Sequence, residues 1–530
     1  MTTLTWTAAC IALIAAVPRP AAHQPPGIPK PRPVRADVRV GAFYFPGWSH
    51  AERWYCVKAH PDVQHPLLGY YREGDPDAAD WHIKWAVEHG VGFFAFDYYS
   101  HNGSQMLEGA LDRGFLRSRF LPGFRFCLNW CNHAPSETMT ADQLERFAEL
   151  VIPKYLTHPS YLRIDGRPVL MILSGYSFVK TLGVNGARRA FEHLDTRCRA
   201  AGLPGVYLVF CEGEILRAES VRDSFAAGAR AFCLYNYPYA GTGQTGPGRH
   251  GEATYAHLIE QGERLWKHWR GITEGRFWPT VMPGWDRRPW LKEDDLRRTG
   301  STPALFEGAL RDARAHVNAS RIVMVEAWNE WGEGSVLEPS VEQGFGYLDA
   351  VRRVFCPSAG SHRDLTPTAA GLPAPVFDLE MPRIDAWAFD HGVEDWTATG
   401  VSGLAAAWGA LEGVSTDDDP QLTSPIAYLP CGRYGACEIR MRAEAVDARH
   451  PTSTGQLFWS TSTQGLSQEA SVTFPVTLDG AWHTHRLDLA ARSHWRGTTD
   501  RFRLDPVALS GVRFAVDEVR FLRRPARPAR

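Results

Sequence analysis

Two apolar patterns alternate over the first 355 residues of the chain. Short, nearly continuous apolar runs rich in β-branched and aromatic residues are separated by longer segments with apolar residues every three or four positions. Such runs are typical of strands buried on both faces of a parallel sheet, and the longer segments have the spacing of amphipathic helices. The predicted strands are residues 38–45, 91–98, 124–130, 168–173, 206–211, 229–235, 277–282 and 321–327. The predicted helices are residues 77–89, 141–155, 184–201, 252–270 and 303–317.

The number and order of these elements indicate the fold class. Eight strands alternating with helices fit a closed (β/α)₈ TIM-type barrel better than an open, doubly wound sheet. A dinucleotide-binding fold is disfavoured, because no strand is followed by the glycine fingerprint of that fold. We therefore expect an α/β barrel over residues 36–356.

The composition of the sequence and the spacing of its apolar residues change after this region. Residues 357–383 are predicted to be a linker, because most of the stretch is rich in Pro, Ala, Gly and Thr. Residues 384–525 contain short alternating segments with frequent turns, which predict an antiparallel β-sandwich. The predicted strands there are residues 436–442, 455–460, 470–476, 483–489, 511–516 and 518–522. The rings of Trp459, Trp482 and Trp495 have two interpretations: exposed contacts of a carbohydrate-binding module, or fillers of a small core.

The N-terminus is treated separately from the fold. Residues 1–24 are predicted to be a signal peptide, because the apolar run 4–17 is too short to cross a bilayer, although no Lys or Arg precedes it. We therefore expect an extracytoplasmic protein, either secreted or periplasmic. No later segment reaches membrane-spanning length, so we expect no membrane span.

Composition restricts the partners. A net charge of −2 gives no electrostatic basis for binding nucleic acid. Ten cysteines in 530 residues do not make a disulfide scaffold, but Cys431 and Cys437 flank a turn-like segment and are either a hairpin bridge or free thiols. Cys127 and Cys131 lack a matching His or Cys pair, so we expect no metal and no cofactor. We expect a monomer.

The most informative motif is Ala-Trp-Asn-Glu-Trp-Gly-Glu-Gly at residues 327–334, at the end of the last predicted barrel strand. If the chain turns helically there, Glu330 and Glu333 share one face. Two carboxyl groups beside indole rings suggest glycoside chemistry, in which an acid and a base or nucleophile flank one C–O bond. The alternative is a solvated turn, which the crowding of Trp and Asn around the two glutamates disfavours.

Other predicted strands also end in aromatic, amide or carboxylate residues. Because a barrel carries its active site at the carboxyl ends of its strands, this pattern favours a sugar-binding rim over unrelated capping or ion-pair contacts. We predict that Glu330 and Glu333 are catalytic. The predicted substrate-binding residues are Tyr44, Trp48, Asp97, Tyr98, Asn129, Trp130, Glu212, Tyr235, Asn236, Trp285, Asp286, Trp328, Asn329 and Trp331.

Three motifs give the chain a family resemblance. Trp-Asn-Glu-Trp-Gly-Glu-Gly at residues 328–334, followed by Leu-Glu-Pro at 337–339, resembles the strand-8 motif of WbsX-type, glycoside hydrolase family 99-like proteins. Ala-Phe-Tyr-Phe-Pro-Gly-Trp at residues 42–48 and Pro-Gly-Trp-Asp at 283–286 are similar to the same family. The resemblance covers roughly residues 38–355. It implies a (β/α)₈ barrel and retaining, endo-acting glycosidase chemistry on α-linked glycans such as mannan.

The resemblance also implies roles for the two carboxylates. Glu330 would act as a base on the sugar 2-hydroxyl, giving a 1,2-anhydro intermediate, and Glu333 would protonate the leaving oxygen and then activate water. Where the mannosidases of this family carry a histidine, this chain has Gly332, which is the pattern of the broader WbsX-like group.

Two other classes of function remain open. A glycosyltransferase of polysaccharide biosynthesis needs a nucleotide-sugar site, and the only acidic run of the required type, Asp417-Asp418-Asp419, lies in the C-terminal β region. The third class is a non-catalytic carbohydrate-binding protein on a barrel that has lost activity. The presence of both glutamates favours an enzyme.

Overall fold

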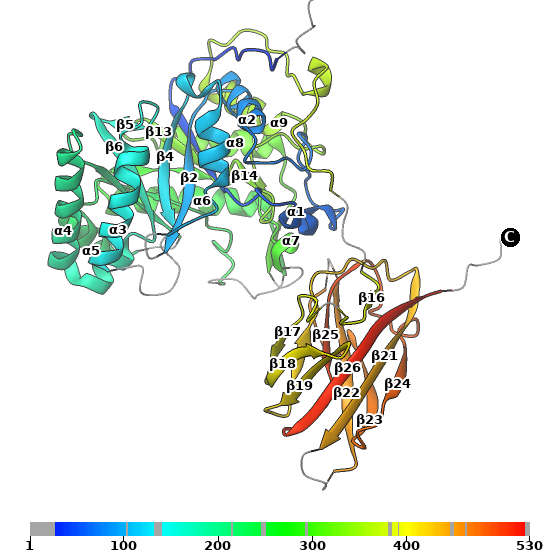
Figure 1. Cartoon of the computed structure of the whole chain (residues 1–530). Coiled ribbons are helices and arrows are strands. Elements are labelled where there is room, and N and C mark those ends of the chain that lie inside the picture. Colours follow the sequence, from blue (N-terminus) through cyan, green and yellow to red (C-terminus); the bar gives the residue numbers. More distant parts are fainter. Residues whose placement is uncertain are drawn as a thin grey trace, which may run out of the picture.

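The computed structural model describes residues 27–524, except residues 102–103, 132–139, 214–215, 245–250, 292–294, 380–383, 391, 446–449 and 462–463. The predicted signal peptide, residues 1–24, lies outside the described residues. Figure 1 shows an α/β barrel in the first part of the chain and a β-sandwich in the last part. The predicted fold class is therefore confirmed.

Parallel strands form the wall of the barrel, in the order β10-β8-β7-β6-β4-β2-β1-β13-β11. They coincide with the predicted apolar runs to within a few residues, because their side chains are buried on both faces. The strands are β1 (Arg39–Tyr44), β2 (Val91–His101), β4 (Arg125–Cys131), β6 (Arg167–Leu173), β7 (Tyr207–Glu212), β8 (Ala231–Leu234), β10 (Phe277–Trp278), β11 (Thr280–Val281) and β13 (Ile322–Val325). The short strands β3 (Ser104–Met106) and β5 (Arg163–Ile164) pair with β2 and β6.

The seventh predicted strand closes the ring in two pieces. β10 pairs with β8 on one side, and β11 pairs with β13 on the other. Only Pro279 separates β10 from β11. Proline has no backbone N–H to donate to a neighbouring strand, but the carbonyl of Pro279 accepts a hydrogen bond from the backbone N–H of Met324 (2.9 Å). Closure brings the carboxyl ends of the strands to one mouth.

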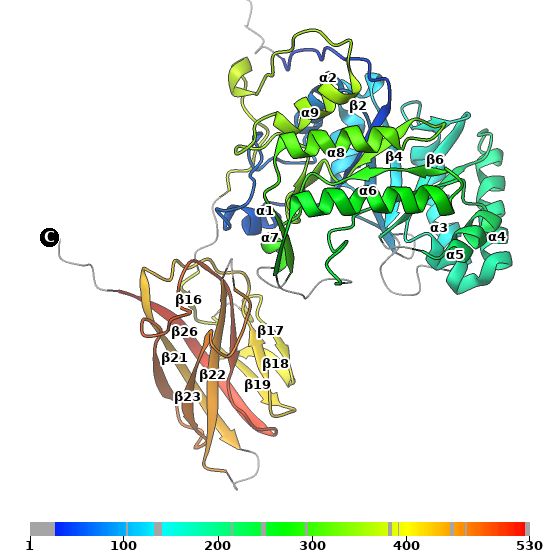
Figure 2. The ribbon, with the colours of Figure 1, turned by 180° about the vertical axis from the view of Figure 1, so that it is seen from behind.

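Helices cover the outside of the barrel, and Figure 2 shows α6 and α8 side by side on it. Side chains of Asp75, Thr140, Thr254 and Thr302 cap α2, α3, α6 and α8 by accepting backbone N–H groups of the first turn. The helices are α1 (Ala51–Lys58), α2 (Pro76–Glu88), α3 (Ala141–Val151), α4 (Tyr176–Ala200), α5 (Ala218–Ala227), α6 (Tyr255–Ile272), α7 (Arg288–Leu291), α8 (Pro303–Ala315) and α9 (Gly346–Phe355).

Three predicted helices differ in detail. The helix predicted over 184–201 begins earlier, at Tyr176, because α4 includes a short helical piece before a kink at Gly183. The helix predicted over 141–155 is α-helical only to Val151 and continues as a π-helical turn, Ile152–Leu156. The helix predicted from 252 is preceded by β9 (Gly251–Thr254), which pairs in parallel with β12 (Leu296–Thr299) outside the barrel wall. Thr254, the cap of α6, marks that boundary.

The segment after α9 packs against the barrel and makes hydrogen bonds to it. The indole N–H of Trp85 donates to the carbonyl of Leu365 (2.8 Å), and the backbone N–H of Phe377 donates to the carbonyl of Tyr70 (2.9 Å). The described part of the stretch predicted to be a linker is thus bound to α2 and to the segment that precedes α2.

Two antiparallel sheets form the C-terminal sandwich and enclose its apolar core. One has the order β18-β19-β26-β21-β24, with β16 beside β26, and the other has the order β17-β20-β25-β22-β23. The strands are β16 (Ala386–Trp387), β17 (Thr397–Thr399), β18 (Val401–Ala407), β19 (Ala410–Ser415), β20 (Gln421–Thr423), β21 (Tyr434–Ala445), β22 (Thr452–Thr461), β23 (Ser471–Thr477), β24 (His483–Asp488), β25 (Thr499–Asp505) and β26 (Val512–Arg523).

Several expectations for this region are corrected. The two strands predicted at 511–516 and 518–522 are the single strand β26. Trp459 and Trp495 are buried in the sandwich core, whereas Trp482 is 37% exposed, so the core-filling interpretation holds for the first two rings only. Cys431 and Cys437 are buried free thiols, so there is no bridge between them.

Candidate active site

A tight hairpin, rather than the predicted helical turn, carries Glu330 and Glu333. β14 (Asn329–Glu330) pairs antiparallel with β15 (Ser335–Val336), and the backbone N–H of Glu333 donates to the carbonyl of Glu330 (3.0 Å). Gly334 has a φ of +65°, and a Cβ there would lie 2.8 Å from the backbone nitrogen of Asp286. A glycine is therefore required where the hairpin meets the loop after β11.

Both glutamates line one cavity of about 410 Å³ at the mouth of the barrel. Its wall combines aromatic rings with a few polar groups, which is typical of small-molecule sites. The lining residues are Phe45, Tyr99, Cys131, Leu173, Ser174, Gly213, Tyr235, Asn236, Tyr239, Trp285, Arg287, Trp290, Glu330 and Glu333. No histidine is among these residues and Cys131 is the only cysteine, so this lining is a poor donor set for a transition metal.

Different neighbours surround the two carboxyl groups. Burial, followed by the negative charge of Glu333, raises the pKa of Glu330 well above its ordinary value. Burial also raises the pKa of Glu333, to about 7, although the Arg287 guanidinium lowers it. The Nε atom of Arg287 lies 3.1 Å from Oε1 of Glu333. Both carboxyl groups therefore hold a proton to a higher pH than an exposed glutamate does, and the Arg287 guanidinium favours the charged form of Glu333.

Tyr235 joins Glu330 to a second acid, Asp97. Its hydroxyl oxygen lies 3.2 Å from Oε1 of Glu330 and 2.7 Å from Oδ2 of Asp97. The Asn129 amide donates to the other oxygen of Asp97 (2.8 Å), and burial raises the pKa of Asp97 to about 7. Because the tyrosine has one proton, it can donate to only one of the two carboxyl groups, and the other contact is a hydrogen bond only if that carboxyl group is protonated.

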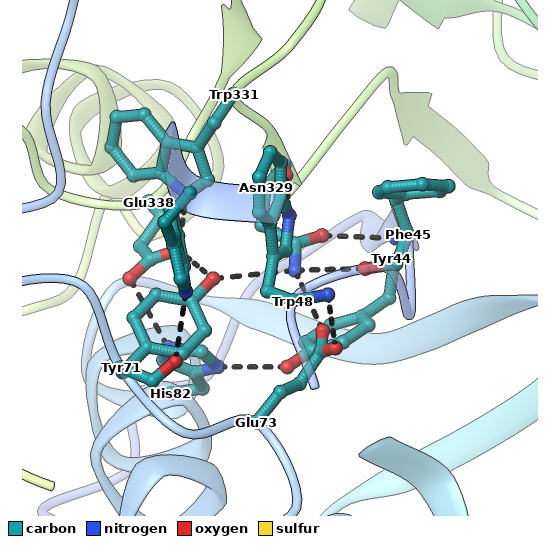
Figure 3. Close-up of polar contacts among 10 residues, drawn as sticks. Tyr44, Phe45, Trp48, Tyr71, Glu73, His82, Asn329, Trp331 and Glu338 are labelled. Atoms are coloured by element: carbon teal, nitrogen blue, oxygen red, sulfur yellow. Dashed lines mark hydrogen bonds and ion pairs between the residues drawn. The ribbon is translucent and has the colours of Figure 1, made fainter. Parts of the chain in front are cut away.

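A buried polar network supports the hairpin from below (Figure 3). The side chain of Asn329 accepts from the backbone N–H of Phe45 (2.9 Å) and donates to the carbonyl of Phe45 (3.0 Å) and to Glu73 (3.2 Å). Glu73 also accepts from the backbone N–H of Trp48 (2.8 Å), and burial raises its pKa to about 8. Asn329 thereby ties the hairpin to the loop after β1.

A second branch of this network contains Glu338. It accepts from the Tyr71 hydroxyl (2.9 Å) and from the Trp331 indole (3.2 Å), and its other oxygen lies 3.1 Å from Nε2 of His82. The opposite nitrogen of His82 lies 3.1 Å from the Tyr44 hydroxyl. Figure 3 shows these side chains directed toward one another. They hold the hairpin and do not line the cavity.

The structure separates the predicted site residues into two sets. Tyr235, Asn236 and Trp285 line the cavity together with the glutamate pair, and Asp97 and Asn129 lie behind Tyr235. The other predicted residues contact protein and do not line the cavity. Those in the network are Tyr44, Trp48, Asn329 and Trp331.

The remaining predicted residues pack or pair elsewhere in the barrel. Trp328 packs on Phe94 and His82, and both Tyr98 and Trp130 pack on Phe147 of α3. Glu212 accepts from the backbone N–H of Tyr176, and Asp286 pairs with Arg288.

Arg287 and Trp290 are the main residues that the sequence prediction missed. Arg287 directly follows the Pro-Gly-Trp-Asp motif, so its position after the seventh strand was the signal that could have identified it. Trp290 lies over the turn of the hairpin: a Cβ at Gly332 would be 1.9 Å from its indole. The small residue at 332 thus makes room for a ring on the cavity wall.

Comparisons with known proteins find a relative of this chain. The protein WxcX of Xanthomonas campestris pv. campestris, itself uncharacterized, is 26% identical over 311 residues, which are 54% of this chain and 42% of the relative. This chain therefore matches less than half the length of that relative.

Two solved structures are similar to part of this chain. A glycoside hydrolase-like protein is 20% identical, covers 63% of this chain and 97% of its own, and has a TM-score of 0.47. A GH99 endo-alpha-mannosidase from Bacteroides thetaiotaomicron, solved with BIS-TRIS-propane, is 18% identical, covers 60% of this chain and 96% of its own, and has a TM-score of 0.43.

Over the described residues, none of the helices is both long enough and apolar enough to cross a membrane.

Residues 45–351 match the family described as glycosyltransferase WbsX. This range contains the hairpin, the cavity and all of the network except Tyr44. The chain belongs to this WbsX family.

Proposed function

We propose that this chain is a glycoside hydrolase in which Glu330 and Glu333 are the catalytic pair. The observation that carries the proposal is that both carboxyl groups line one aromatic cavity while their surroundings differ. Glycoside cleavage needs one carboxyl group that donates a proton and one that is ionised, and a difference in surroundings is how proteins separate the two states. The substrate class that we propose is an α-linked polysaccharide or oligosaccharide such as mannan.

In this proposal Glu330 acts as the base on the sugar 2-hydroxyl, and Glu333 protonates the leaving oxygen and then activates water. These roles require an ionised Glu330 and a protonated Glu333. Burial raises the pKa of Glu330, so this group has to give up a proton, whereas Glu333, with a pKa of about 7, carries its proton in part of the molecules near neutral pH. Tyr235 and Asp97 offer a path for the proton of Glu330: Glu330 passes it to the Tyr235 oxygen while Tyr235 passes its own to Asp97. The pKa of Asp97, about 7, suits a group that takes up and returns a proton near neutral pH.

The experiment is a screen of wild type, Glu330→Gln and Glu333→Gln against a glycan panel, with detection of new reducing ends. We expect wild type to release sugar from an α-linked glycan and both variants to lose nearly all of that rate. Glu219→Gln, an exposed residue of α5, is the matched control and should keep full rate. A folded Glu330→Gln or Glu333→Gln variant with unchanged rate would refute the assignment.

A glycosyl transfer is the second candidate, because the family to which the chain belongs is described as a glycosyltransferase. The same carboxylate pair would then activate an acceptor hydroxyl in place of water. Adding unlabelled acceptor oligosaccharides, with or without nucleotide sugars, to the same assay separates the two. Chain elongation at the expense of reducing-end release would favour transfer.

For the C-terminal sandwich we propose glycan binding through Trp408, which is fully exposed at the turn between β18 and β19. An exposed ring of this kind buries well against the apolar face of a pyranose. Retention of the full chain on insoluble polysaccharide should fall in Trp408→Ala and stay unchanged in Leu466→Ala, another exposed apolar residue.

We also propose that the protein is exported. Fractionation of the producing cell tests this proposal.

A further inference from the structure

A cluster of histidine and aspartate side chains lies at the other end of the barrel from the cavity. His89 follows α2 and stands two residues before β2 begins, so it is at the amino ends of the strands. His362 and Asp364 come from the segment after α9, and Asp349 comes from α9 itself. The His89 side chain is completely buried. The cluster thus joins three segments that are far apart in sequence.

Three ligand atoms converge in this cluster. Nε2 of His89 lies 3.1 Å from Oδ1 of Asp364, and Nε2 of His362 lies 3.2 Å from that same oxygen. All three atoms are within 4.8 Å of one another. Ligands bound to a tetrahedral ion at about 2.0–2.2 Å are separated by about 3.3–3.6 Å, so these spacings are close to those of a coordination shell.

The three atoms are not satisfied by hydrogen bonds to one another. Each of them is buried and lacks an aligned hydrogen bond in spite of the short separations. Nδ1 of His89 lies 2.7 Å from the carbonyl oxygen of Trp85 and can donate to it, which leaves the lone pair on Nε2 directed at the cluster. A backbone carbonyl in this position is the usual support for a metal-bound imidazole.

We propose that His89, His362 and Asp364 bind a divalent transition-metal ion, with Zn²⁺ as the best match. Two imidazoles and a carboxylate suit zinc, whereas Ca²⁺ and Mg²⁺ take oxygen ligands. Asp349, whose Oδ1 lies 3.7 Å from Nε2 of His89, stands next to the three ligands and supplies further negative charge. The ion fastens the segment around residue 362 to the end of α2, where His89 lies. Its role is structural, because the catalytic pair lies at the opposite end of the strands.

The competing explanation is an imidazolium cluster without a metal, in which protonated His89 pairs with Asp364 and Asp349. Other charges face the same place: an oxygen of Glu88 lies 3.9 Å from Nε2 of His362, and Arg352 contacts the backbone carbonyl of Glu88. Both explanations use the same side chains. Only the metal explanation predicts that zinc is retained and raises the melting temperature.

The test uses the untagged full chain, because a histidine tag binds zinc. After incubation with ZnCl₂ and gel filtration, we expect wild type to retain about one zinc ion per chain and to melt at a higher temperature than after treatment with EDTA. His362→Ala and Asp364→Asn should lose both the retained zinc and the shift. His193→Ala, an exposed histidine of α4 paired with Glu145, is the control and should keep both.

Substitution by Co²⁺ gives a readout that does not depend on the variants folding. Wild type loaded with Co²⁺ should develop the visible absorption of a four-coordinate site, and adding Zn²⁺ should remove it. Zinc retention that is equal in wild type, His362→Ala and Asp364→Asn would overturn the proposal. So would a wild-type chain that retains no zinc and melts at the same temperature with zinc and with EDTA.

Discussion

Two adjacent residues of β14 show how one motif supplies two different environments. Asn329 points into the buried network, where its amide has backbone and carboxylate partners. Glu330 lines the cavity, where it has a hydrogen bond to Tyr235. Successive side chains of a strand point to opposite faces, so this separation follows from the strand conformation itself. The network fixes the hairpin, and the cavity face is left free for chemistry. Carboxyl groups occur on both faces, but only those on the cavity side are open to a substrate.

The largest effect should come from the cavity side. In Glu330→Gln the amide keeps the shape of the side chain but can neither accept nor supply the catalytic proton, so we expect about a 10²–10⁴-fold loss of kcat. The melting temperature should stay close to that of wild type, because the neutral amide replaces a carboxyl group that the site already favours as neutral. Initial rates and thermal melts on the same preparation check this. Unfolding of the variant would contradict the division between the two faces.

The network side should respond in the opposite way. Asn329→Ala leaves the backbone N–H and carbonyl of Phe45 without their side-chain partner, at about 1–3 kcal/mol for each unsatisfied buried group, and removes one hydrogen bond to Glu73. We expect a lower free energy of unfolding in urea. Asn185→Ala, an exposed residue of α4, is the control and should change it little. An Asn329→Ala chain as stable as wild type would show that the network does not hold the hairpin.

Arg287 should set the pH dependence of the cavity side. Its guanidinium opposes the rise in the pKa of Glu333, which burial brings to about 7. Arg287→Met therefore raises that pKa further, so the pH at which Glu333 loses its proton moves upward. The pH–rate profile of the variant should shift to higher pH, whereas Arg297→Gln, on β12, should leave it in place. A profile that moves downward would contradict the role given to the guanidinium.

The smallest effect concerns Glu212, a buried acid that belongs to neither face of the hairpin. Burial raises its pKa to about 8, and it accepts the backbone N–H of Tyr176. A carboxyl group whose pKa is raised by folding stabilises the protein while protonated, and this stabilisation is lost as the pH rises through about 8. Glu212→Gln keeps the acceptor oxygen, so its melting temperature should fall less between pH 6 and pH 9 than that of wild type. Parallel melting curves for the two proteins over this range would exclude the effect.

The barrel could be predicted because buried parallel strands leave a direct mark on the sequence. The run 91–98 and the strand Val91–His101 begin at the same residue. The same regularity separates predicted rim residues that are neighbours in sequence. Asp97 and Tyr98 are neighbours on one strand and therefore cannot both face the mouth: Asp97 contacts Tyr235, and Tyr98 packs on Phe147.

The hairpin and its partners were harder to predict. A spacing of three residues between Glu330 and Glu333 suits a helix, but Gly332 and Gly334 allow a tight turn that tertiary contacts with Trp290 and Asp286 select. Arg287 was missed because it lies in a loop, where no periodic pattern shows the direction of a side chain. Cys431 and Cys437 are close in sequence, but bridging also depends on side-chain direction, which spacing does not determine.

The most direct measurement is the rate of reducing-end release by Glu330→Gln, Glu333→Gln and the double variant on the best glycan found in the screen. Residues that act as one catalytic unit have strongly non-additive losses. We predict that the double variant is no slower than the slower single variant. Losses that multiply, or a single variant that keeps the wild-type rate, would contradict a shared role for the two carboxyl groups.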